Sequence, residues 1–254
     1  MQTERPHILL TNDDGIYAKG LSVLRDALSE LGEVTVVAPE RPRSASGHAI
    51  TLHKPLRAEQ VELPWGGTGY SSNGTPSDCV VLGLYALMPT CDLVVSGINL
   101  GPNLGEDITY SGTVSAAMEG AICGKPAIAA SLVATDHPDF RPTARFISKL
   151  ARLVLARGLP ADLLLNVNVP NLPEDALGPP RVTRQGKRRY DGRVEKRIDP
   201  RGRAYYWLGG EIIEELAGEG SDGEAILHGH ISITPLHLNL THAPFAEELK
   251  GWEW

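Results

Sequence analysis

The sequence predicts a doubly wound α/β fold with a mainly parallel sheet and a C-terminal extension rich in β-strands. Short apolar runs of strand length alternate with segments of helical period along most of the chain. These runs carry no polar face, which is typical of strands that helices cover on both sides. The chain of 254 residues is long enough to bury a large core. We therefore expect a single domain over residues 1–254.

The strands and helices can be assigned in chain order. The expected buried strands are HILLTN (7–12), VTVVAP (34–39), DLVVSG (92–97), PAIAAS (126–131) and LLLNVNVP (163–170). The expected helices are GLSVLRDALSEL (20–31), PSDCVVLGLYAL (76–87), SGTVSAAMEGAICG (111–124) and ARFISKLARLVLARG (144–158). Residues 47–63 alternate in polarity, which predicts an antiparallel hairpin, and further strands are expected in 205–213 and 230–240.

The composition narrows the class of protein. With 24 Lys and Arg against 31 Asp and Glu, the formal charge is −7, which does not favour nucleic acid or an anionic membrane as a partner. Cys79, Cys91 and Cys123 form no C-x-x-C pair and lie in apolar stretches, which predicts buried thiols in a reducing compartment. The sequence shows no apolar run of about 18 residues and no signal-peptide pattern at its start. We expect a cytoplasmic protein.

Asp13 and Asp14 stand side by side directly after the first expected strand. In a doubly wound sheet, ligands bind outside the carboxyl ends of the strands. Adjacent carboxylates repel each other and are costly near apolar surroundings unless a cation neutralises them. Oxygen ligands without His or Cys suit Mg²⁺ or Mn²⁺. The alternative is that one aspartate caps a helix beginning near Tyr17, but two of them at one strand end favour a metal site.

Two neutral oxygen ligands are expected at the same edge of the sheet. Ser44 lies in the turn after VTVVAP and offers a hydroxyl, and Asn99 follows DLVVSG and offers an amide oxygen. Each of them alone is typical of a turn residue that bonds its own backbone. We include both in the expected metal shell because they follow strands that end at the same edge of the sheet.

The loop after DLVVSG leads into YSGTVSAAMEG, where Ser111 or Thr113 is expected to begin a helix. The free N–H groups around Ser111, Gly112 and Thr113 would then form an anion site at the same rim. A metal beside a helix N-terminus is what phosphate ester chemistry requires. The same residues are equally consistent with a simple N-cap, and the two interpretations are compatible.

Several motifs together resemble the stationary-phase survival protein SurE family of metal-dependent 5′/3′-nucleotidases. They are TNDDGI, APERPRSASGHAIT, GTPSDCV, VSGINLGPNLG, YSGTVSAAMEG, LNVNVP, RQGKRRYDGRVEKR and SITPLHLNLT, in this order over nearly the whole chain. The resemblance implies a Rossmann-like domain that hydrolyses nucleoside monophosphates with one divalent cation per subunit. It also implies a homodimer or homotetramer, and a metal held by Asp13, Asp14, Ser44 and Asn99, with the two aspartates catalytic.

Direct attack of metal-activated water on phosphorus is the expected mechanism, with one aspartate accepting the proton. A phosphatase of the haloacid dehalogenase type requires aspartates at i and i+2, but Asn12 and Asp14 stand there. A receiver-like regulatory module that binds Mg²⁺ and is phosphorylated without turnover is the alternative function. Ser96 and Asn99 occupy the region where its phosphorylated aspartate would lie. The role of His48, as a proton carrier or as a residue that orients its loop, stays open.

The stretch from Arg181 to Arg203 carries ten Lys and Arg against three acids. Such a run is usually a solvated face, and the alternatives are a subunit contact or a rim that attracts phosphorylated substrates. We predict that residues 181–211 form a protruding arm for oligomerisation, because four aromatic residues add apolar area: Tyr190, Tyr205, Tyr206 and Trp207.

Overall fold

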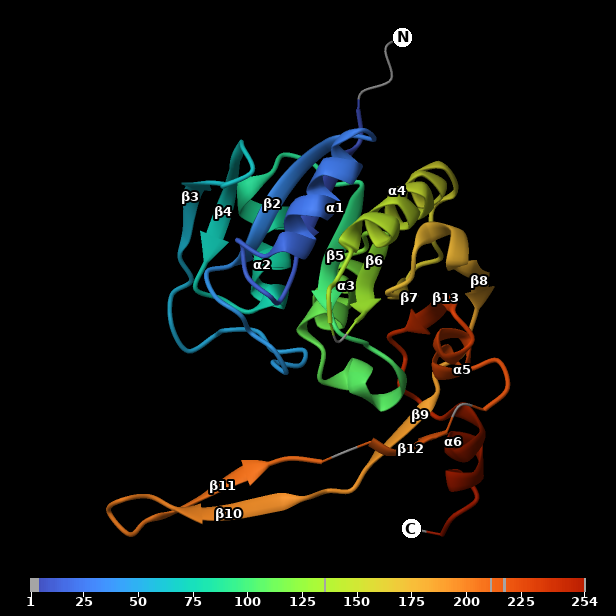
Figure 1. Cartoon of the computed structure of the whole chain (residues 1–254). Coiled ribbons are helices and arrows are strands. Elements are labelled where there is room, and N and C mark those ends of the chain that lie inside the picture. Colours follow the sequence, from blue (N-terminus) through green and yellow to red (C-terminus); the bar gives the residue numbers. More distant parts are fainter. Residues whose placement is uncertain (1–4, 135, 211, 217, 254) are drawn as a thin grey trace.

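The computed structural model describes residues 5–134, 136–210, 212–216 and 218–253, with only the backbone of 189 and 212–216. It confirms the predicted α/β class with a large, mainly parallel sheet (Figure 1). The nine strands follow the order β3-β4-β2-β1-β5-β6-β7-β13-β8. Their bounds are β1 (His7–Thr11), β2 (Glu33–Pro39), β3 (Ala58–Glu62), β4 (Thr68–Ser72), β5 (Leu93–Leu100), β6 (Ala127–Val133), β7 (Leu163–Pro170), β8 (Gly178–Val182) and β13 (His230–His237).

The central strands run parallel and the edges are mixed. Neighbouring strands from β4 to β7 are parallel, whereas β3 pairs antiparallel with β4 and β13 antiparallel with β7. The late strand β13 adds an antiparallel strand beside the parallel core. It confirms the prediction of a strand in 230–240. Because β1 lies between β2 and β5, the chain reverses its winding direction beside β1, which is where ligands bind in such sheets.

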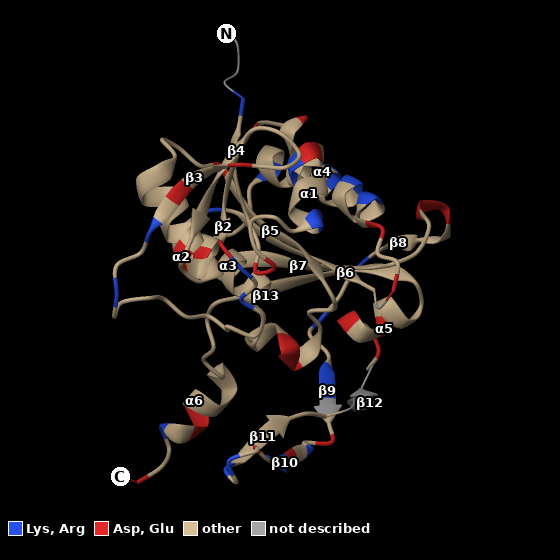
Figure 2. Ribbon diagram, turned by 60° about the vertical axis from the view of Figure 1, so that its left-hand side comes forward, with Lys and Arg blue, Asp and Glu red and all other residues tan. Residues whose placement is uncertain are grey.

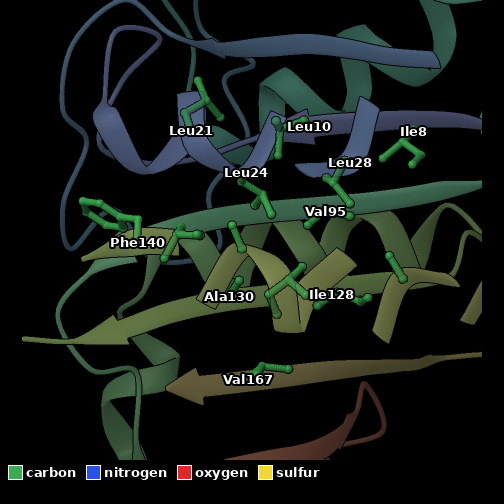
Figure 3. Close-up of a cluster of buried hydrophobic side chains, with 14 of the residues drawn as sticks. Ile8, Leu10, Leu21, Leu24, Leu28, Val95, Ile128, Ala130, Phe140 and Val167 are labelled. Carbon is green, nitrogen blue, oxygen red and sulfur yellow. The ribbon is translucent and has the colours of Figure 1, made fainter. Parts of the chain in front are cut away.

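Helices cover both faces of the sheet. Their bounds are α1 (Lys19–Ser29), α2 (Pro76–Leu82), α3 (Gly112–Ile122), α4 (Phe140–Arg157), α5 (Asp222–Leu227) and α6 (Ala243–Leu249), with shorter turns η1 (Gly83–Leu87), η2 (Gly105–Thr109) and η3 (Glu174–Ala176). Figure 3 shows the core under α1 and α4, where Leu24 and Leu28 pack against Val95 and Ile128. On the opposite face, α2 and α3 cover a second apolar cluster.

Small residues bring α3 close to the sheet. A Cβ on Gly120 would lie 2.9 Å from Val94 Cβ, closer than real side chains approach. Ala116 and Ala117 are fully buried on the same helix. This close packing fixes the direction in which the N-terminus of α3 points.

The expected hairpin over 47–63 is wrong for most of its length. Only β3 forms, and it pairs with β4, while residues 48–57 have no regular structure. The reason is that side chains at the start of α2 bind this backbone instead of a neighbouring strand. Asp78 accepts hydrogen bonds from Thr51 N (2.9 Å) and Thr51 Oγ1 (2.7 Å), and Thr75 Oγ1 donates to Ala49 O (2.7 Å).

A long two-stranded hairpin projects from the body, at the lower left in Figure 1. Its outer part pairs β10 (Val194–Ile198) with β11 (Ala204–Leu208), and its base pairs β9 (Lys187–Tyr190) with β12 (Ile212–Leu216). The predicted arm began at Arg181, but Arg181 lies in β8 of the main sheet, and residue 211 lies outside the described residues. Figure 2 shows Lys and Arg on β9 and near the hairpin tip. None of the helices formed by described residues has the length and hydropathy needed to cross a bilayer.

Candidate active site

The acidic pair lies in the turn that leaves β1, at the reversal point of the sheet. Gly15 has a φ of +97°, which L side chains rarely adopt, so the glycine permits the sharp turn after Asp14. Asn12 closes this turn, because its Nδ2 donates to Gly15 O (3.0 Å) and its Oδ1 accepts from Gly15 N (3.2 Å). Asn12 is therefore structural, and the two aspartates are presented at the rim.

Asp13 is almost fully enclosed, with 5% of its surface exposed. Its Oδ1 accepts a short hydrogen bond of 2.5 Å from Thr113 Oγ1 at the start of α3. Burial raises the pKa of this carboxyl, while the hydroxyl of Thr113 and the backbone N–H groups of Thr113 and Gly112 oppose the increase. The N-terminus of α3 thus faces Asp13.

Asp14 is half-buried, and its Oδ2 accepts one long hydrogen bond of 3.4 Å from Leu100 N at the end of β5. Burial, followed by repulsion from Asp13, raises the pKa of Asp14 to about 6. Neither aspartate caps α1, because the N-cap is Ala18 and no side chain bonds the cap. The capping alternative is therefore excluded, and the pair remains poorly neutralised by the surrounding described residues.

Ser44 and Asn99 flank the aspartates on the two neighbouring strand ends. Arg43 N donates to Asp13 O (2.7 Å), which brings the loop with Ser44 next to the acidic turn. Ser44 itself is exposed. Asn99 Nδ2 donates to Gly101 O (2.9 Å), and among the described residues no hydrogen bond occupies its Oδ1. The structure places Asp13, Asp14 and Ser44 in adjoining loops and Asn99 near the end of β5, all at one edge of the sheet.

The predicted phosphate-binding residues form the first turn of α3. Ser111 is the N-cap, and its Oγ accepts from Val114 N (3.1 Å). A Cβ at Gly112 would lie 2.8 Å from Asp13 Cβ and 2.9 Å from Ser46 Oγ, so any larger residue would crowd the acidic turn. Thr113 acts on Asp13 through its hydroxyl, a contact that sequence reasoning did not anticipate.

Ser46 is a polar residue of this region that the sequence analysis missed. Its Oγ is buried without a hydrogen-bond partner among the described residues, and it lies beside Gly112. The preceding Ala45 has a φ of +54°, which turns the chain sharply between Ser44 and Ser46. The only indication of this role in the sequence is that Ser44 and Ser46 stand two positions apart in a turn that contains a glycine.

His48 bonds α3 and stands away from the helix N-terminus. Its Nε2 lies 2.7 Å from Oε2 of the buried Glu119, about two turns along α3 from Thr113. Gly47 N also donates to Tyr110 O (3.0 Å). These contacts hold the loop of Ser44 against α3, which matches the loop-orienting interpretation of His48.

Buried asparagines hold the loop that follows Asn99. Asn103 N donates to Asn168 Oδ1 (2.8 Å), and Asn103 O accepts from Asn166 Nδ2 (2.9 Å) and Asn168 Nδ2 (3.0 Å). Asn103 Nδ2 donates to Ser131 Oγ (2.7 Å). Two asparagines at i and i+2 in the otherwise apolar LLLNVNVP were the signal for this arrangement.

The donor set fits a hard divalent cation. Among the described residues, no group of three or more His, Cys, Asp or Glu side chains could hold a metal, so a complete shell here needs neutral oxygens. Two carboxylates with raised pKa values and nearby hydroxyl and amide oxygens are the ligands that Mg²⁺ and Mn²⁺ prefer. The adjoining helix N-terminus adds donors for an anion.

Comparison with known proteins finds one matching family and several similar proteins. The family described as "Survival protein SurE" matches residues 8–192 of the chain. A protein of Geotalea daltonii named "5'-nucleotidase SurE" is 52% identical over 248 residues, covering 97% of this chain and 98% of the relative. Proteins of the same name from Geobacter sulfurreducens and Moorella thermoacetica are 51% and 52% identical, covering 97% and 96% of this chain and 94% and 95% of the relatives.

A solved structure has the same fold. The chain is 46% identical to the structure titled "Crystal Structure of Sure Protein from Aquifex aeolicus", with a TM-score of 0.84. The similarity covers 96% of this chain and 98% of that one. The agreement therefore includes the late strands as well as the parallel core.

Proposed function

The chain belongs to the survival protein SurE family and is a 5′-nucleotidase, and we propose that it hydrolyses nucleoside 5′- and 3′-monophosphates with a divalent cation. The observation that carries the metal dependence is the acidic pair at the reversal point of the sheet. Burial raises the pKa values of Asp13 and Asp14, and repulsion from Asp13 adds to the increase at Asp14, so the ionised pair requires a cation.

We assign Asp13, Asp14, Ser44 and Asn99 as the residues that would hold the cation, Mg²⁺ or Mn²⁺. When bound there, such a cation supplies Lewis acidity for the phosphoryl oxygens and for water. Asp14 is the better candidate to accept the proton of the attacking water, because Asp13 already accepts a hydrogen bond from the Thr113 hydroxyl.

Residues at the start of α3 act on the phosphoryl group in this proposal. The N-terminus of α3 supplies N–H donors around Ser111, Gly112 and Thr113, and the missing side chain of Gly112 leaves space beside Asp13. Thr113 also fixes Asp13 through its hydroxyl, so the two parts of the site are joined. No side chain is required to become phosphorylated, and water attacks phosphorus directly.

The test is phosphate release from a panel of substrates. We expect release from 5′- and 3′-nucleoside monophosphates with Mg²⁺ or Mn²⁺, and loss of activity with a chelator. Equal rates in chelator would contradict the metal assignment. Labelling of the protein by a phosphodonor without repeated turnover would instead support the receiver-like module.

We further propose that the hairpin formed by β10 and β11 joins subunits into a homodimer or homotetramer. An isolated two-stranded hairpin is at best marginally stable in water. Every residue of β10 and β11 is exposed, including Ile198, Tyr206, Trp207 and Leu208. Burial of these side chains by another copy would supply the missing apolar contacts.

Sedimentation tests this second proposal. Replacing residues 194–208 by a short Gly-Ser linker should lower the oligomeric state, while the chain keeps its βα core. An unchanged sedimentation coefficient would contradict the subunit contact.

The negative overall charge and the free thiols also support a cytoplasmic enzyme that does not act on nucleic acid.

A further inference from the structure

The turn η2 connects the two halves of the site. It follows the loop after Asn99 and ends at Thr109, two residues before the N-cap Ser111. Its apolar side is fixed to the body, because Leu104 and Ile108 are buried. Its polar side faces the base of the hairpin, and β9 contacts η2 directly (Figure 1).

Asp107 is the centre of a polar contact between η2 and β9. Its Oδ2 accepts from Arg188 Nη1 (2.8 Å) and from Tyr190 OH (2.6 Å). The ion pair is shielded, since 9% of the Arg188 side chain and 20% of the Asp107 side chain are exposed. Burial, with a further contribution from Asp107, raises the pKa of Tyr190 to about 12, so the phenol keeps its proton and donates.

The backbone around Asp107 is held by the same part of the chain. Arg188 N donates to Glu106 Oε2 (2.7 Å), and Gln185 Nε2 donates to Gly105 O (3.0 Å). The buried Asp222 accepts from Gly105 N (2.9 Å) and from Gly186 N (2.8 Å). The Asp222 carboxylate therefore binds both η2 and the residues before β9. This holds the two elements that Asp107 and Arg188 connect.

Movement of η2 would reach the reacting groups through a short path. Tyr110 N donates to Asp107 O (3.0 Å), and Tyr110 O accepts from Gly47 N (3.0 Å) in the loop that carries Ser44. The next residue, Ser111, begins α3 and precedes the groups that face Asp13. A displacement of about 1 Å at a reacting centre can reduce a rate by about a hundredfold.

We propose that Asp107 is a positioning residue for the hydrolysis, which fixes the start of α3 by binding Arg188 and Tyr190 at the base of the hairpin. This inference rests on the proposed function of the α3 N-terminus. In this proposal the base of the hairpin holds η2 in place, whereas the exposed outer part contacts another subunit. The side chains of Asp107, Arg188 and Tyr190 contact one another, and they act on the phosphoryl group only through η2.

The experiment compares Asp107→Asn and Tyr190→Phe with Glu174→Gln in the full-length protein. Asp107→Asn keeps the shape of the side chain and removes its charge, and Tyr190→Phe removes one donor. Glu174→Gln is the control, because it breaks the exposed Arg145–Glu174 ion pair outside η2 and the hairpin. The measurements are kcat and KM for a nucleoside monophosphate, the cation concentration at half-maximal rate, and amide hydrogen exchange at residues 110–114.

We expect kcat to fall about tenfold in Asp107→Asn and less in Tyr190→Phe, with the half-maximal cation concentration and the KM within about twofold of the unaltered protein. Amide exchange at Gly112 and Thr113 should accelerate by a similar factor. Glu174→Gln should change neither quantity. This separation of kcat from cation affinity is not expected from a general loss of stability.

The proposal is overturned if kcat and exchange in both variants equal those of Glu174→Gln, or if kcat falls only together with cation affinity. If Asp107→Asn does not fold, Tyr190→Phe decides by the same two measurements. If the unaltered protein releases no phosphate, the proposed function fails. Exchange at Gly112 and Thr113 then still tests whether Asp107 fixes α3.

Discussion

Replacing Asp14 by Asn should stabilise the metal-free protein while removing most of its activity. The pKa of Asp14 is raised from 3.8 to about 6, so the folded state binds this proton more tightly than the unfolded state. The carboxyl therefore costs no folding free energy below about pH 4. Its cost grows as the pH rises toward 6 and is constant above that, and Asn avoids it.

The size of the effect follows from the shift. Two pH units correspond to about 3 kcal/mol at most, and solvent screening of this half-buried group reduces the value to about 1–2 kcal/mol. For a chain of this length, that is an increase in Tm of about 2–8 °C at pH 8. The increase should shrink toward zero at pH 4.

Thermal unfolding in chelator and with Mn²⁺ is the assay. Asp26→Asn is the matched control, since this exposed carboxylate pairs with Arg25 on the surface and should change Tm little. With Mn²⁺ the order should reverse, because the unaltered protein gains binding energy that Asp14→Asn has lost. A lower Tm than the unaltered protein in chelator at pH 8, or an undiminished gain with Mn²⁺, would refute this reasoning.

Three other changes test the site. Ser44→Ala and Asn99→Ala should reduce cation affinity and rate less than Asp14→Asn, because neutral ligands contribute less attraction; titration of activity with Mn²⁺ checks this. Gly112→Ala should lower kcat at least about tenfold, since its Cβ would lie 2.8 Å from Asp13 Cβ, whereas a neutral result would show that the turn can adjust. A chiral phosphomonoester should be hydrolysed with inversion at phosphorus, and retention would indicate a phosphorylated enzyme intermediate.

The fold was predictable from local patterns, and the same patterns predict that the residues of the candidate site lie together. Buried parallel strands appear as continuous apolar runs, and the residues after them fall at one edge of the sheet. The hairpin predicted over 47–63 failed for a nonlocal reason. Its backbone is bound by Asp78 and Thr75, and alternation of polarity within the stretch contains no information about those partners.

The residues that support the site were the part that sequence reasoning could not assign. His48 and Glu119 are 71 positions apart, and Asp107 and Arg188 are 81 apart, so neither pair has a spacing that could reveal it. Thr113 was expected either to cap α3 or to bind phosphate; the N-cap is Ser111, and the Thr113 hydroxyl donates to Asp13. In each case the residue type was visible, but its partner depended on tertiary packing.

The contact between Thr113 and Asp13 resolves why an anion-binding helix terminus and an acidic pair can occupy one rim. The N-terminus of α3 and the Thr113 hydroxyl lower the cost of ionising Asp13, against a larger effect of burial. Among the described residues, Asp14 receives only the long hydrogen bond from Leu100 N, so more of its charge is left uncompensated. The helix therefore assists Asp13, and the proposed cation would neutralise the charge that remains on Asp14. This asymmetry explains why Asp14 is the carboxylate whose removal should most clearly separate stability from activity.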